Sequence, residues 1–127
     1  MSLGKIKADT LEHSTAGSVD TQFVVNGSAK AWVNFNGTGT IAARDSLNHS
    51  GLTDNGTGDY TASYTNSMGN ANYVPFHIAT HDTSNIGPSG ETQSRATGSV
   101  EFECRYQGNN TVYDHLDCYV GIFGDLA

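Results

Sequence analysis

The sequence has few basic residues and no long apolar run. It contains 6 Lys and Arg residues against 13 Asp and Glu residues, which gives a formal net charge of −7 at pH 7. Nucleic-acid binding relies on clustered cations that neutralise phosphates, so this charge argues against a nucleic-acid partner. No segment approaches the roughly 20 consecutive apolar residues that span a bilayer, so we expect no membrane insertion. The first ten residues lack the apolar core of a secretory signal, which favours synthesis in the cytoplasm.

Core-forming residues are also scarce. Hydrophobic residues make up 36% of the chain, whereas Gly, Thr, Ser and Asn together occupy 52 of the 127 positions. That composition is typical of turns and strand faces and excludes a protein built from long helices. A domain of this size buries only about two-thirds of the surface that its unfolded chain exposes. We therefore expect one small domain that associates with copies of itself.

Motifs of enzymes are absent as well. The sequence has no Gly-x-Ser-x-Gly elbow, no phosphate-binding loop and no dinucleotide fingerprint. Its five histidines form no dense cluster with other metal ligands, although a threefold axis would bring three copies of one histidine together. We expect no enzyme activity, no catalytic residue, no metal and no cofactor. A small glycan-degrading enzyme with a hidden carboxylate pair stays as the third hypothesis.

What is present is a period-two alternation of apolar and polar residues, which is the pattern of half-buried strands. It predicts at least six short strands, at 28–35, 40–44, 59–65, 73–80, 99–107 and 115–123. Turns rich in Asn and Gly separate most of them, and the Asn-Gly pair at 36–37 predicts a tight hairpin. The expected fold is all-β, an antiparallel β-sandwich that is jelly-roll-like or a compact barrel, and oligomeric.

Two regions depart from this alternation. Residues 1–26 mix a polar, small-residue stretch with strand patterning, and we interpret them as an N-terminal connecting arm ahead of a β-sandwich domain at 27–127. Residues 81–98 are polar and show no period, which predicts a long exposed loop. The predicted strands at 99–107 and 115–123 then form the final hairpin.

The two cysteines, Cys104 and Cys118, fall on same-parity faces of that final hairpin and so can lie close together. Spacing alone does not establish a disulfide. Cytoplasmic synthesis favours free, buried thiols, and neither cysteine lies in a Cys-x-x-Cys motif.

Candidate binding residues gather near the last predicted turn. Aromatic rings and amide groups suit the recognition of sugars, and this turn region contains Tyr106, Asn109, Asn110, Tyr113 and His115. The alternative is that the tyrosines pack against a neighbouring loop or subunit, because aromatic residues are common at protein interfaces. Trp32 presents the same choice between a subunit contact and a ligand platform.

Three segments carry a resemblance to a known family: GSAKAWVNFNGTGTIA at 27–42, RDSLN at 44–48 and TDNGTGDYT at 53–61. Together with residues 5–25, they resemble the C-terminal region of tail-fibre proteins of tailed bacteriophages, especially those of aquatic environments. The likeness covers about the first half of the chain. In the second half only residues 70–73 and 120–125 resemble the endings of that family.

This resemblance implies a β-rich, trimeric fibre tip that contacts a host surface, and it carries over no catalytic residue. We therefore expect a structural and adhesive module of a virion, synthesised in the host cytoplasm. The implied partners are the chain itself as a homotrimer, other phage tail proteins, and a glycan or protein of the host surface. The alternative function is a stand-alone, lectin-like carbohydrate-binding protein.

Overall fold

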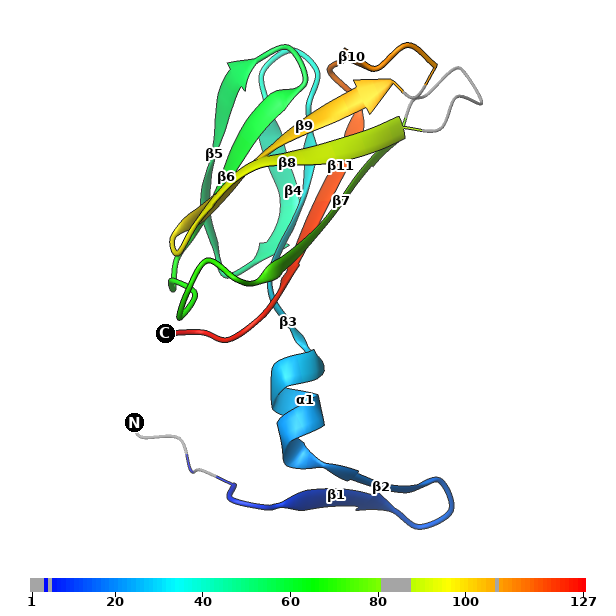
Figure 1. Ribbon diagram of the computed structural model, residues 1–127, viewed down its shortest axis with the longest axis vertical. Coiled ribbons are helices and arrows are strands. Elements are labelled where there is room, and N and C mark those ends of the chain that lie inside the picture. The colour runs from blue at the N-terminus through cyan, green and yellow to red at the C-terminus, as the bar shows by residue number, and fades with distance from the viewer. Residues whose placement is uncertain (1–3, 5, 81–87, 107) are drawn as a thin grey trace.

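The computed structural model describes residues 4, 6–80, 88–106 and 108–127. Its secondary structure is almost entirely strands, which confirms the all-β prediction (Figure 1). The elements in chain order are β1 (Thr10–His13), β2 (Gly17–Asp20), α1 (Thr21–Gly27), β3 (Ala29–Asn36), β4 (Ala42–Leu47), β5 (His49–Gly56), β6 (Asp59–Tyr64), β7 (Val74–Thr80), β8 (Pro88–Ala96), β9 (Ser99–Tyr106), β10 (Thr111–Val112) and β11 (Asp117–Phe123).

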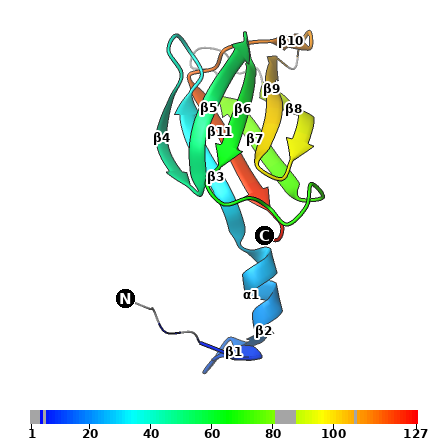
Figure 2. The ribbon, with the colours of Figure 1, turned by 90° about the vertical axis from the view of Figure 1, so that its left-hand side faces the viewer.

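Two antiparallel sheets stack face to face to form a sandwich (Figures 1 and 2). The four-stranded sheet has the order β4-β3-β11-β7. The five-stranded sheet has the order β10-β9-β6-β5, and β8 pairs with β9. The hairpin β3–β4 contains the Asn-Gly pair at 36–37 from which it was predicted, and β5 pairs with β6 in a second hairpin around the Gly-bearing turn at 56–58.

The core lies between the two sheets and is built from alternate residues of their strands. At its centre the ring of Phe35 meets Tyr60 edge-on at a centroid distance of 5.0 Å and Phe102 at 6.1 Å. All three side chains have no exposed surface. The alternation of buried and half-buried residues along β3, β6, β9 and β11 is the period-two pattern of a sheet with one face in the core.

The hairpin β1–β2 and helix α1 project from one end of the sandwich and join it through β3 (Figure 1). The strand patterning expected in the arm runs over residues 19–25 of the sequence, but residues 21–25 belong to α1. The helix begins where Thr21 donates from its backbone nitrogen to the Asp9 carbonyl and from Oγ1 to the Ala8 carbonyl, at 2.8 and 2.6 Å. These bonds to the start of the hairpin redirect the chain out of the strand.

Two of the predictions for the second half are wrong. Residues 88–96 form the strand β8 instead of a loop, and residues 81–87 of that predicted loop lie outside the described residues. The strands β9 and β11 do not form a hairpin, because β9 pairs with β6, β8 and β10 whereas β11 pairs with β3 and β7. The chain crosses from one sheet to the other between them.

Candidate functional site: the turn region opposite the arm

The turn from β9 to β10 and the segment that leads into β11 lie at the end of the sandwich away from the arm (Figure 1). The short strand β10 folds back on the end of β9, where Thr111 pairs with Tyr106 and Val112 with Arg105. The Asn110 nitrogen donates to the Tyr106 carbonyl at 2.8 Å, which closes the turn. Four of the five candidate binding residues are therefore held in one small region.

Each asparagine has a defined part in this turn. Asn110 has a φ of 58°, a left-handed conformation that asparagine adopts more readily than most residues. Asn109 accepts a hydrogen bond from the Thr111 nitrogen through Oδ1 at 3.1 Å. The Arg105 guanidinium donates to the Asn110 carbonyl at 3.1 Å. Both asparagines are exposed at the surface of the turn.

The two tyrosines contact each other. The rings of Tyr106 and Tyr113 lie edge to face, with centroids 6.0 Å apart and planes at 74°. Tyr113 is 43% exposed and Tyr106 is half-buried. Gly108 lies against this pair. A Cβ at this position would lie only 2.7 Å from the Tyr106 ring, so glycine allows the backbone to approach so closely. The tyrosine pair and the two exposed asparagines form one surface of rings and amides.

His115 does not belong to that surface. It is 2% exposed, and its carbonyl accepts from the Gly37 nitrogen at 2.9 Å, so it lies beneath the turn region as part of the packing. The structure thus brings Tyr106, Asn109, Asn110 and Tyr113 together and places His115 in the interior.

Asp114 fixes this region to the sandwich, a role that its position in a polar loop did not reveal. Its Oδ1 accepts from the Gly58 nitrogen at 2.7 Å and from the Tyr60 hydroxyl at 2.9 Å. The same hydroxyl lies 2.8 Å from the Gly37 carbonyl, to which it can also donate. Burial and the hydrogen bond to Asp114 raise the pKa of Tyr60, which keeps the phenol protonated as a donor. A core tyrosine therefore holds the segment that carries Tyr113.

Arg44 secures the other side of the same segment. It forms an ion pair with Asp117 at 2.8 Å and donates to the Leu116 carbonyl at 2.8 Å. With Asp114 on one side and Arg44 on the other, the segment between β10 and β11 is bonded to both sheets. Rigid support of this kind lowers the entropy that a binding surface loses when it meets a ligand.

Over the described part of the chain, no cluster of three or more His, Cys, Asp or Glu side chains is arranged to hold a metal ion. Within the same residues, no helix is long and apolar enough to cross a membrane.

Comparison of the chain with protein-family models, with curated proteins and with solved structures gave no match.

Proposed function

We propose that this chain is a structural and adhesive module of a virion, the tip of a tail fibre, which forms a homotrimer and contacts the host cell surface. The observation that carries the proposal is the N-terminal arm. The resemblance of residues 27–42, 44–48 and 53–61 to tail-fibre proteins implies the family and a trimeric assembly. The arm gives a physical reason for copies of the chain to associate.

The arm has no core of its own. None of its described residues in β1, β2 and α1 is buried. Ile6 is 94% exposed, Phe23 64% and Val25 60%. An isolated two-stranded hairpin is marginal in water, and an isolated helix shorter than about 12 residues is too. Arms from neighbouring copies that pack together would bury these apolar side chains and stabilise the elements that carry them.

The arm and the candidate binding turn lie at opposite ends of the molecule (Figure 1). This arrangement suits a fibre tip, in which one end joins other tail proteins and the other end is free to meet a host. The rings of Tyr106 and Tyr113 and the exposed amides of Asn109 and Asn110 can stack on and hydrogen-bond to a surface glycan or protein.

The first experiment measures the mass of the full chain by light scattering at micromolar concentration. We expect three times the monomer mass of 13.4 kDa. The double variant Phe23→Ser/Val25→Ser should shift the equilibrium towards monomer, because it removes exposed apolar contacts from α1. Leu116→Ser is the matched control, since it replaces an apolar side chain that is 41% exposed outside the arm. A monomeric wild-type chain would contradict the proposal and favour the lectin-like alternative.

The second experiment tests adhesion on glycan arrays and bacterial cells. Tyr113→Ala and Asn110→Ala should weaken binding while the oligomer mass stays unchanged. Asn72→Ala, an exposed asparagine outside the turn region, is the control and should bind as the wild type does. If both turn variants keep the wild-type mass and wild-type binding, the turn region is not the receptor site.

A further inference from the structure

The outward face of the four-stranded sheet has an apolar centre. Of its charged residues, Lys30 and Asp117 lie towards the ends of their strands, and Arg44 and Asp45 lie on the edge strand β4. Along β7 the exposed apolar side chains are Val74 at 52%, Phe76 at 63% and Ile78 at 54%, and Thr80 at the end of the strand is exposed as well. These residues occupy alternate positions of the strand and so share one face, which the sandwich turns away from its core. Single exposed apolar side chains are normal on a monomer, but a contiguous apolar patch indicates an interaction surface.

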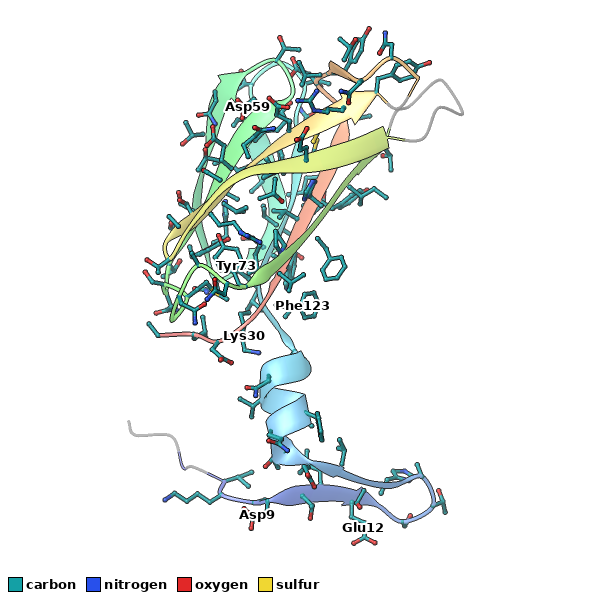
Figure 3. All side chains as sticks on the ribbon, viewed as in Figure 1. Asp9, Glu12, Lys30, Asp59, Tyr73 and Phe123 are labelled. Atoms are coloured by element: carbon teal, nitrogen blue, oxygen red, sulfur yellow. The ribbon has the colours of Figure 1, made fainter. Side chains whose placement is uncertain are left out.

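The patch extends across all four strands. In the sheet register Leu47 lies opposite Trp32, Trp32 opposite Gly121, and Gly121 opposite Phe76. The rings of Phe76 and Phe123 are in edge-to-face contact, with centroids 5.6 Å apart. Figure 3 places Phe123 close to the end of the sandwich that bears the arm. The patch therefore continues towards the exposed apolar side chains of α1.

A hollow lies in the middle of this face, where Gly121 separates Trp32 from Phe76. Glycine weakens the interior of a strand and often marks a close approach by another molecule. The fold of this chain does not require it there. The φ of Gly121 is not in the left-handed region, and a Cβ built on it would have its nearest neighbour, a Phe123 ring carbon, at 4.0 Å. By contrast, a Cβ at Gly37 would lie 2.6 Å from the Tyr60 hydroxyl.

The opposite outer face differs. On the five-stranded sheet the outward positions of β6 and β9 are occupied by polar or charged residues, among them Thr61, Ser63, Glu101 and Glu103. The chain carries a net charge of −7, so copies that approach through such a face would bring like charges together. The uncharged centre of the four-stranded sheet lets two copies approach without that penalty.

We infer that the outward face of the four-stranded sheet is the contact between copies of this chain, and that the hollow over Gly121 receives an apolar side chain of the neighbouring copy. The inference rests on the homotrimer proposed above and deepens it by naming the surface. The outward side chains around the hollow are Trp32, Phe76, Ile78 and Tyr119, with Asn34 as the amide beside them, so a sugar stacked on the rings is the competing occupant that the experiment distinguishes. The strand β3 joins this face directly to α1, so copies held by their arms would bring these faces together.

The test uses the full chain and fills the hollow with Gly121→Leu. The new side chain has room in the monomer, so circular dichroism should show the wild-type fold. The trimer of this variant should dissociate at protein concentrations roughly tenfold or more above those at which the wild-type trimer dissociates. Phe76→Ser should weaken the trimer in the same way by removing contact area, without placing a bulkier residue in the sheet. Ser63→Leu adds the same leucine to an outward position of the other sheet and should leave the dissociation constant unchanged.

The outcomes separate this inference from the proposed function. If the wild type is a trimer that Phe23→Ser/Val25→Ser weakens, while Gly121→Leu and Phe76→Ser leave its dissociation constant unchanged, the homotrimer stands and this interface is overturned. If folded Gly121→Leu and Phe76→Ser keep the trimer but lose binding to glycans, the face binds a sugar and the inference is also overturned. A monomeric wild type overturns both.

Discussion

Cys104 and Cys118 bring their sulfur atoms to 3.9 Å from each other, although they belong to opposite sheets. Cys104 lies on β9 with 1% of its surface exposed, and Cys118 lies on β11 with none exposed. Both are free thiols, as predicted. Their proximity was also predicted, but for the wrong reason, since they face each other across the core and not across a hairpin. A hydrogen bond to Cys118 and burial raise the pKa of Cys104, so its thiol stays protonated.

We expect both thiols to be unreactive in the folded protein, because the thiolate is the nucleophile and neither sulfur reaches solvent. Ellman's reagent at pH 8 should react with the native chain only as slowly as the protein opens. In guanidinium chloride it should titrate both cysteines within minutes. Rapid reaction of either cysteine under native conditions would contradict the buried arrangement.

Stability should fall as the pH rises above about 9. Burial is the main cause that raises the pKa of the core tyrosines Tyr60, Tyr64 and Tyr73. The pKa of Cys104 is raised as well. In the unfolded chain such groups lose their protons near pH 8.5 to 10, as roughly expected for cysteine and tyrosine. Above that pH the folded state binds more protons than the unfolded state. Each group therefore lowers the free energy of unfolding by at most about 1.4 kcal/mol for every pH unit of further increase.

The measurement is the thermal midpoint between pH 7 and 11 at one protein concentration. Tyr64→Phe removes a shifted hydroxyl while keeping the ring, so its midpoint should fall less steeply with pH than that of the wild type. Tyr113→Phe removes the same hydroxyl from a side chain that is 43% exposed and serves as the control. Identical slopes for the wild type and Tyr64→Phe would exclude a contribution from Tyr64.

Gly58 and Gly39 offer a matched pair for testing the packing of the turn region. Both have a left-handed backbone, with φ of 66° and 62°. A Cβ at Gly58 would lie 2.6 Å from the Tyr113 nitrogen and 2.8 Å from the Cys104 carbonyl oxygen, whereas a Cβ at Gly39 would have nothing within 4 Å. Gly39→Ala should cost about 1–2 kcal/mol for its backbone conformation alone. Gly58→Ala should cost about 1–3 kcal/mol more because backbone atoms must move.

Urea unfolding of the two alanine variants at equal protein concentration measures the difference. Equal decreases in the free energy of unfolding would mean that the segment carrying Tyr113 moves aside freely, and would contradict the close packing of this region.

Asp114→Ala should destabilise the fold by about 1–3 kcal/mol, because it removes the acceptor shared by the Gly58 nitrogen and the Tyr60 hydroxyl. Asp125→Ala removes an exposed carboxylate and should change the free energy of unfolding by about 0.5 kcal/mol or less. Chemical denaturation of Tyr60→Phe, Asp114→Ala and the double variant Tyr60→Phe/Asp114→Ala measures the coupling between the two residues, and Asp125→Ala is measured alongside as the control. If the effects of Tyr60→Phe and Asp114→Ala are simply additive, the two residues do not act as a pair.

The local alternation predicted which residues share a face of a strand. Tyr60, Ala62 and Tyr64 are buried together on β6, and Val100, Phe102 and Cys104 on β9. The strand β8 was missed because it lies at the edge of its sheet and most of its described side chains are exposed, so its sequence lacks an apolar period. Its backbone pairing with β9 makes it a strand, and pairing between distant segments leaves little trace in a single sequence.

The sequence by itself determined the all-β class, the early hairpins and the gathering of ring and amide residues near the last turn, because each of these depends on neighbours in the chain. Only the tertiary structure decided that β9 and β11 lie in different sheets, that His115 is interior, and that Val74, Phe76 and Ile78 face outward. A period of two states that alternate residues share a face, but which face meets the core depends on the sheet that packs against it. That choice is made by contacts between segments far apart in sequence, and in this protein it leaves an apolar face uncovered.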